Sequence, residues 1–118
     1  MDVRVRALIG RNKDELREVE FLVDTGSFYT VLPPELATDL GISAALNTEV
    51  TLADRRKVEI GVGSAYLRWD DRQGAVPIGI MDVPMPLLGA TALEGLGRKV
   101  NPVEGTLEHS RPFGPFVL

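Results

Sequence analysis

The stretch FLVDTGSFYTVLP, at positions 21–33, places a single carboxylate, Asp24, between two runs of apolar, strand-forming residues. In an ordinary polar hairpin turn the flanking residues alternate between apolar and polar, whereas these flanks are densely apolar, so we expect the turn to be buried. A carboxylate in a buried turn is costly unless it is paired or hydrogen-bonded, and such groups concentrate at functional sites. The alternative is a common exposed Asp-Gly turn.

The composition restricts the chemistry that the chain can perform. Its 118 residues are the length of one compact domain, which we expect to span residues 1–118. Without cysteine, thiolate nucleophiles, disulfides and zinc ribbons are excluded. The single histidine, His109, lies near the C-terminus and is predicted to be a surface residue. We therefore expect neither a metal site nor a cofactor.

The charge and hydropathy patterns also limit the partners. The net charge is -4, and the basic residues gather no further than Arg55-Arg56-Lys57, so no nucleic-acid partner is expected. The N-terminus alternates charged and apolar residues, unlike a signal peptide, and no segment approaches the ~18 apolar residues of a membrane helix. We expect a cytoplasmic protein that does not enter the membrane.

The residue patterns predict a mainly-β, barrel-like domain of six to nine short strands and one or two short helices. Alternation over residues 3–9 and an apolar run ending at residue 23 indicate a first hairpin. Further segments are predicted as a strand over 28–32, a helix over 34–40, a hairpin of 49–53 with 57–69, a strand over 75–80, a helix over 90–97 and short strands at 99–100 and 106–108. Gly61 and Gly63 suggest a bulge or bend in the second hairpin. The apolar tail, residues 111–118, is expected to pack at an interface.

Two motifs together resemble a known family. LVDTGSFYTVLP is similar to the active-site segment of the single-domain aspartic proteases of retroviral type, and PLLGATALEGLG, about sixty residues later, is similar to that family's second element. The segment VTLADRRKVEI between them would be the flap hairpin. The resemblance covers roughly residues 1–110. It implies a closed or partly open β-barrel of the acid-protease type with one or two short helices.

The resemblance also implies roles for individual residues. Asp24 would be the catalytic carboxylate, and the Thr25 hydroxyl would lock two active-site loops together across a dimer axis. Gly26 would let the backbone hydrogen-bond the carboxylate, while Leu88 and Gly89 would brace the loop from beneath. The remaining assigned residues are Ser27, as loop support, and the flap residues Ala53, Asp54, Arg55 and Arg56, as the substrate cover.

A count of carboxylates predicts a dimer. Hydrolysis of a peptide by carboxylates needs one ionised group to activate water and one protonated group to polarise the carbonyl. The chain has one Asp-Thr-Gly, so the second Asp24 must come from another copy. The other acids considered lie in predicted helix, turns or loops: Asp39, Asp54, Asp70, Asp71 and Asp82. In aspartic proteases as a class, the two carboxylates lie about 3 Å apart and share one proton.

Two features depart from the family pattern. An Asp and an Arg that commonly pair in retroviral members are replaced by Phe28 and Ala90, which suggests apolar packing in place of an ion pair. The flap tip Asp54-Arg55-Arg56 lacks glycine, which suggests a stiffer, charged flap, or simply an ordinary exposed hairpin. We also expect the Ser27 hydroxyl to donate to Asp24 and favour its ionised form, the alternative being that Ser27 caps the turn.

These observations favour a homodimeric aspartic endopeptidase that cuts extended peptides. One alternative is a catalytically silent, dimeric peptide-binding or scaffold module of the same fold. Another is a structural β-domain of a larger complex, whose apolar tail binds a different protein.

Overall fold

A computed structural model describes residues 2–101 and 106–109, with side chains up to residue 97. This part of the chain forms nine strands and two short helices, which confirms the predicted mainly-β class. The elements are β1 (Arg4–Gly10), β2 (Leu16–Asp24), β3 (Thr30–Leu32), α1 (Pro34–Asp39), β4 (Leu46–Thr51), β5 (Lys57–Trp69), β6 (Arg72–Ile80), β7 (Leu87–Gly89), α2 (Ala90–Gly95), β8 (Arg98–Asn101) and β9 (Thr106–His109). The apolar tail at 111–118 lies outside the described residues.

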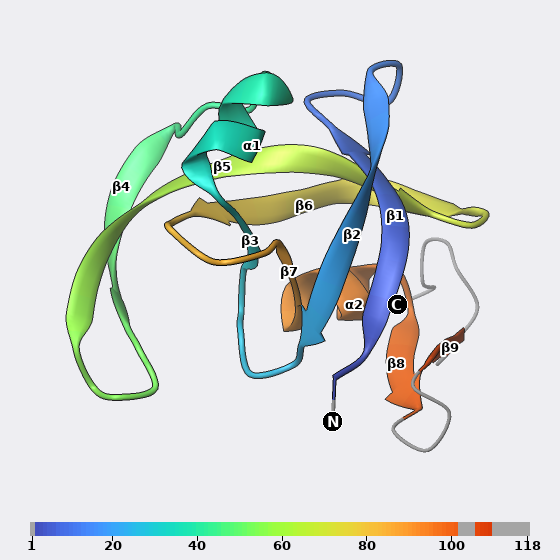
Figure 1. Ribbon diagram of the computed structural model, residues 1–118. Helices are drawn as coiled ribbons and strands as arrows, with labels where there is room; N and C mark the ends of the chain where they lie inside the picture. The colour runs from blue at the N-terminus through green and yellow to red at the C-terminus, as the bar shows by residue number, and fades with distance from the viewer. Residues whose placement is uncertain (1, 102–105, 110–118) are drawn as a thin grey trace, which may run out of the picture.

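Seven of these strands form one sheet that closes on itself. Their order is β1-β2-β7-β3-β6-β5-β4, and an additional pairing of β1 with β5 joins the sheet into a six-stranded barrel from which β4 projects (Figure 1). Strands β8 and β9 pair separately as an antiparallel hairpin. The acid-protease barrel expected from the sequence is therefore present, and β4 with the adjoining part of β5 reaches away from it.

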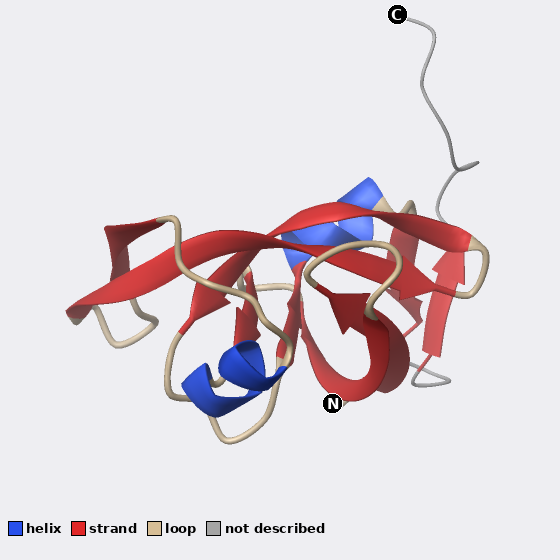
Figure 2. Cartoon of the chain, turned by 90° about the horizontal axis from the view of Figure 1, so that it is seen from above, coloured by secondary structure: helices blue, strands red, loops and turns tan. Residues whose placement is uncertain are grey.

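The barrel interior is filled by alternate residues of its strands. In β1 and β2 the antiparallel register sets Ala7 opposite Val19 and Val5 opposite Phe21, so the buried positions of both strands lie on one face. The largest fully buried side chains are Phe21, Ile9, Leu32, Leu67, Ile78 and Leu88. Figure 2, from above, shows the two helices on opposite sides of the sheet. Each helix contributes buried residues to the same core.

The first helix begins at Pro34, as the sequence predicts, and ends at Asp39, one residue before the expected end. Pro34 occupies its first turn, where a missing N–H costs nothing, and Gly41 follows it at φ +72°. An added Cβ at Gly41 would lie 3.2 Å from Cδ of Arg11, so the glycine also lets the β1–β2 turn approach the helix end.

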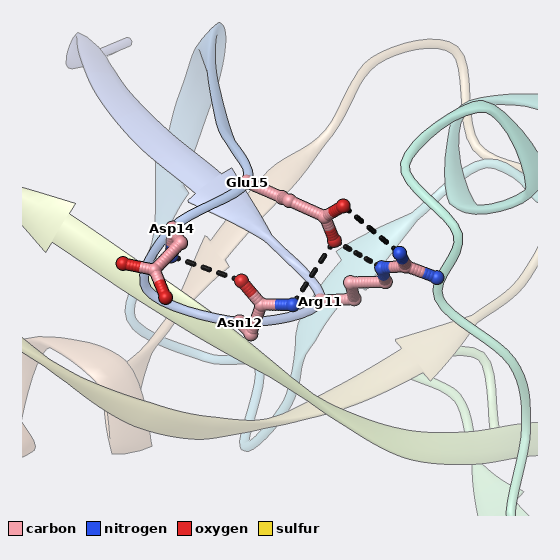
Figure 3. A network of polar contacts seen from close by, with 4 residues as sticks. All are labelled: Arg11, Asn12, Asp14 and Glu15. Carbon is pink, nitrogen blue, oxygen red and sulfur yellow. Dashed lines mark hydrogen bonds and ion pairs between the residues drawn. The ribbon is translucent and has the colours of Figure 1, made fainter.

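The β1–β2 turn is held by a small polar network (Figure 3). The Arg11 guanidinium makes a two-point contact with Glu15, Asn12 Nδ2 donates to Glu15 at 3.0 Å, and the Asp14 N–H donates to Asn12 Oδ1 at 2.9 Å. The hydrogen bond from Arg11 is the main reason why the pKa of Glu15 lies below its ordinary value. The network is exposed, so it fixes the turn more than it stabilises the fold.

Two local expectations are wrong. The strand expected over 28–32 begins only at Thr30, because the backbone of residues 27 and 28 hydrogen-bonds the start of α2 instead of a neighbouring strand. Of the bulge or bend expected at Gly61 and Gly63, the bulge is absent, since the pairing of β5 with β6 runs without an inserted residue from Gly61 to Trp69. An added Cβ at Gly63 would lie 2.4 Å from the Ser43 carbonyl oxygen, so this glycine instead permits a close backbone approach.

In the part of the chain that the structure describes, no helix is long and apolar enough to cross a membrane.

Candidate active site

Asp24 is the last residue of β2 and is fixed by the strand beside it. The parallel pairing of β2 with β7 sets Val23 opposite Leu88 and Asp24 opposite Gly89. Immediately after the strand the chain turns sharply, and the Gly26 N–H donates to Asp24 Oδ1 at 3.0 Å. The carboxylate is thus held on a short, well-anchored turn at the edge of the barrel.

The turn after Asp24 is less buried than the sequence suggests. In the single chain Asp24 is half-buried, while Thr25 and Gly26 are exposed. The apolar flanks do reach the core, since Phe21 and Leu32 are fully buried, but the turn between them emerges at the surface. Apolar flanks report the burial of strands, and they do not determine the burial of the turn that joins them.

The second motif packs directly beneath this turn. An added Cβ at Gly89 would lie 2.2 Å from the Tyr29 carbonyl oxygen and 2.8 Å from that of Ser27, so only glycine fits here. The Ala90 N–H donates to the Ser27 carbonyl at 2.7 Å, which gives a backbone N–H at the start of α2 a partner in the loop. The two motifs therefore form one interlocked unit, although about sixty residues separate them.

Thr30 belongs to this unit and was not anticipated. Its side chain is fully buried, and its Oγ1 accepts a hydrogen bond from the Gly89 N–H at 3.1 Å. In the sequence Thr30 reads as one more β-branched residue of an apolar strand. The available signal is the hydroxyl itself, because a polar group in a fully buried position needs a partner.

Ser27 does not contact the carboxylate as expected. Its Oγ donates to the Tyr29 carbonyl at 2.7 Å, and its N–H donates to the Asp24 carbonyl at 3.1 Å. Both bonds close the turn within its own backbone. The alternative reading, in which Ser27 caps the turn, therefore fits the geometry.

Asp24 faces a cleft of about 450 Å³ between the active-site loop and the β4–β5 hairpin. The hairpin and the loop, far apart in the sequence, thus line one space, and the segment after β6 closes its side. The lining residues are Asp24, Gly26, Ser27, Phe28, Tyr29, Val31, Val50, Thr51, Leu52, Ala53, Ile60, Met81, Val83 and Leu87. Among these described residues Asp24 supplies the only carboxylate, and most of the others are apolar.

Of the four flap residues expected to cover the site, Ala53 lines the cleft and the other three do not. Asp54, Arg55 and Arg56 form the exposed tip of the hairpin beyond it. The lining comes instead from residues just before the tip, such as Val50 and Leu52. Four consecutive residues, 50–53, line the cleft, so the alternation of a strand would not have singled them out.

The hairpin tip is closed by polar contacts in place of glycines. The Leu52 N–H donates to the Arg56 carbonyl at 2.8 Å, and Arg56 Nε lies 2.6 Å from Asp54 Oδ2. The Arg56 backbone N–H, together with its guanidinium, holds the pKa of Asp54 below its ordinary value. Arg55 adopts a left-handed conformation at φ +69°, which is unfavourable for a residue with a side chain.

Phe28, which replaces the family's usual Asp, is only partly packed. Its ring meets that of Tyr29 edge to face, with 5.0 Å between centroids and 84° between planes, yet the residue remains 63% exposed. The expected apolar replacement of the missing ion pair therefore leaves most of Phe28 open in the single chain. No group of three or more acidic or histidine side chains that could hold a metal ion occurs among the described residues.

Comparisons with known proteins agree with this architecture. The family model described as "Aspartyl protease" matches residues 5–92. Among solved structures, the fold is similar to the EIAV protease complexed with the inhibitor HBY-793, with a TM-score of 0.67, 20% identity, and coverage of 86% of this chain and 93% of that one. No curated protein matches the sequence. The family match spans the first motif, the hairpin, most of the barrel and the start of the second motif as far as Ala92. By this match the chain belongs to the aspartyl protease family, with a retropepsin-like fold.

Proposed function

We propose that the protein is an aspartic endopeptidase that acts as a homodimer, with one Asp24 from each copy. The observation that carries the proposal is that Asp24 is the sole carboxylate among the described residues lining the cleft. Carboxylate-based peptide hydrolysis needs two acids of opposite protonation state. The exposure of Thr25 and Gly26 in the single chain supports the proposal, because it leaves the turn open to a second copy.

In the proposed mechanism a two-fold axis brings the two Asp24 carboxyl groups together. Because neighbouring carboxylates resist double ionisation, the pair holds one proton. The ionised member takes a proton from a water molecule, which attacks the peptide carbonyl, and the protonated member donates to the carbonyl oxygen. The resulting tetrahedral species collapses when a proton reaches the leaving amine, which breaks the C–N bond and leaves a new carboxyl group and a new amine.

The surrounding residues would keep this pair in place. The Gly26 N–H, 3.0 Å from Asp24 Oδ1, fixes the orientation of each carboxyl group, and Leu88 and Gly89 support the loop from the neighbouring strand. We assign to the Thr25 hydroxyl a contact between the two loops across the axis. Acid–base catalysis requires the reacting groups to be held in a fixed geometry. Here the carboxyl groups would be held by short, hydrogen-bonded strands.

The substrate would lie extended in the cleft, between the Asp24 pair and the β4–β5 hairpins. Strand β4 lies at an edge of the sheet, and Val50, Leu52 and Ala53 line the cleft, so the hairpin can cover a peptide strand. We assign the tip residues 54–56 to the outer rim of this cover. The EIAV protease, whose fold is similar, is itself described in complex with an inhibitor, which supports a protease role for this fold.

The test is hydrolysis of a denatured protein at acid pH by the purified chain, with Asp24→Asn as the control. We expect the native chain to cleave, a statine-type transition-state mimic to stop it, and the variant to be inactive while still folded. If the native chain binds extended peptides without cleaving them, the protein is a silent peptide-binding module. If Asp24→Asn retains turnover, the chemistry lies elsewhere.

A further inference from the structure

Phe28 is an exposed aromatic residue inside the wall of the cleft. Among the described residues two large hydrophobic side chains are exposed, Phe28 at 63% and Leu46 at 57%. Phe28 lines the cleft that Asp24 faces, whereas Leu46, at the start of β4, does not. A single exposed apolar side chain on an outer surface is unremarkable. One inside a candidate substrate cleft is covered whenever the cleft is filled.

The position of Phe28 is imposed by the scaffold. Its carbonyl accepts a hydrogen bond from the Thr91 N–H at 3.3 Å, and the preceding carbonyl, of Ser27, accepts one from the Ala90 N–H at 2.7 Å. Both donors belong to the first turn of α2. On its other side the ring rests edge to face against Tyr29. The aromatic surface is therefore presented by anchored backbone.

The surroundings of Phe28 favour an apolar occupant. Leu87, Met81 and Val83 line the same cleft. Of the two hydroxyl-bearing neighbours of Phe28 in the chain, Ser27 already donates to the Tyr29 carbonyl at 2.7 Å, and Tyr29 presents an aromatic ring to Phe28. Because most of the lining is apolar, a polar or charged side chain placed here would lose water and meet few hydrogen-bonding groups, which disfavours its binding.

We propose that Phe28 is a specificity-determining residue that selects a large apolar side chain, aromatic above all, in the peptide that occupies the cleft. This inference rests on the proposed function, since it names the substrate class of the same site. In a homodimer the two-fold axis would present one Phe28 on each side of the scissile bond. The preference should therefore appear at two positions of the substrate, one on either side of the cut.

The test compares the native chain with Phe28→Ala, Phe28→Leu and the matched control Leu46→Ala. Each is given a mixture of peptides in which one position at a time is varied, and the products are identified by mass spectrometry. We expect the native chain to prefer large apolar residues at a pair of positions flanking the cut. Phe28→Ala should reduce that preference about tenfold, equivalent to about 1.4 kcal/mol, Phe28→Leu should reduce it less, and Leu46→Ala should leave it unchanged.

Each other outcome counts for or against the inference. Hydrolysis by Phe28→Ala with an unchanged profile overturns the inference and leaves the proposed function standing. Loss of the dimer in sedimentation, together with loss of hydrolysis of every peptide in the mixture, shows that Phe28 serves the contact between copies and also overturns the inference. If the native chain does not hydrolyse, equilibrium binding of Phe-containing and Asp-containing peptides decides. A preference that Phe28→Ala abolishes upholds the inference while the proposed function fails, and equal or absent binding overturns both.

Discussion

The interlock of the two active-site motifs depends on the absence of a side chain at Gly89, and Gly89→Ala tests it. The added Cβ would lie 2.2 Å from the Tyr29 carbonyl oxygen, 2.5 Å from its carbonyl carbon and 2.8 Å from the Ser27 carbonyl oxygen. All three atoms are backbone, so no side chain can rotate away. The loop and β7 would have to separate by about 1 Å, and overpacking of this kind costs ~1–3 kcal/mol.

The separation would also strain two hydrogen bonds. These are Gly89 N–H to Thr30 Oγ1, at 3.1 Å, and Ala90 N–H to the Ser27 carbonyl, at 2.7 Å. Each buried group left unpaired costs about 1–3 kcal/mol. Taking the lowest value of each contribution, we expect Gly89→Ala to lower the free energy of unfolding by at least about 3 kcal/mol, a large share of the ~5–15 kcal/mol of a typical domain.

Urea denaturation followed by the fluorescence of Trp69, the single tryptophan, measures this loss. Gly95→Ala is the matched control, because nothing lies within 4 Å of its added Cβ and it ends α2. It should leave the free energy of unfolding unchanged or raise it by up to about 1 kcal/mol. If the free energy of unfolding of Gly89→Ala lies within about 1 kcal/mol of that of the native chain, Gly89 does not approach the loop backbone as closely as described.

Three further predictions concern the loop and the hairpin. Ser27→Ala should cost about 1 kcal/mol of unfolding free energy and leave the pH–rate profile in place, whereas a shift of its acidic limb would show that the hydroxyl reaches the carboxylate. Thr30→Val should cost about 1–3 kcal/mol in urea denaturation, because it leaves the Gly89 N–H without its acceptor, and an unaltered midpoint would contradict that bond. The pKa of Asp54 is lowered in the folded chain by Arg56, so its contribution to the hairpin is present above its unfolded pKa of about 4 and is lost as the pH falls through the folded value. NMR shifts of the amides at 52–56 should follow that loss, and Asp54→Asn should abolish the titration step; a step that persists in the variant belongs to another group.

Most of the barrel could be predicted from the sequence, because the residue patterns that indicate its strands and helices are local. The alternation in β1, the apolar end of β2 at Phe21 and the proline and glycine that bound α1 each follow from a few neighbouring residues. The two motifs are also visible, because the Asp24 turn and the glycine at 89 are required by backbone geometry that few residues can satisfy.

The features that the sequence did not yield depend on distant partners. Ser27 is the exception, because its hydroxyl bonds the Tyr29 carbonyl two residues away, and the sequence left open whether it bonds this backbone or the Asp24 carboxylate. Thr30 has its role only because Gly89 is its neighbour in space. Met81 and Val83 line the cleft with Asp24, but the residue pattern of their own segment does not indicate that they lie near Asp24. The role of Thr30 and the make-up of the cleft walls are consequences of tertiary arrangement, which no local window of sequence contains.

The central claim is that two copies of Asp24, one from each chain, make one active site. Its most direct test mixes native chain with Asp24→Asn at constant total concentration, under conditions in which subunits exchange, and follows hydrolysis against the fraction of native chain. If both carboxylates are required, activity falls with the square of that fraction, to about one quarter at equal amounts. A linear decline, with about one half remaining at equal amounts, would mean that each chain works alone and would contradict the account.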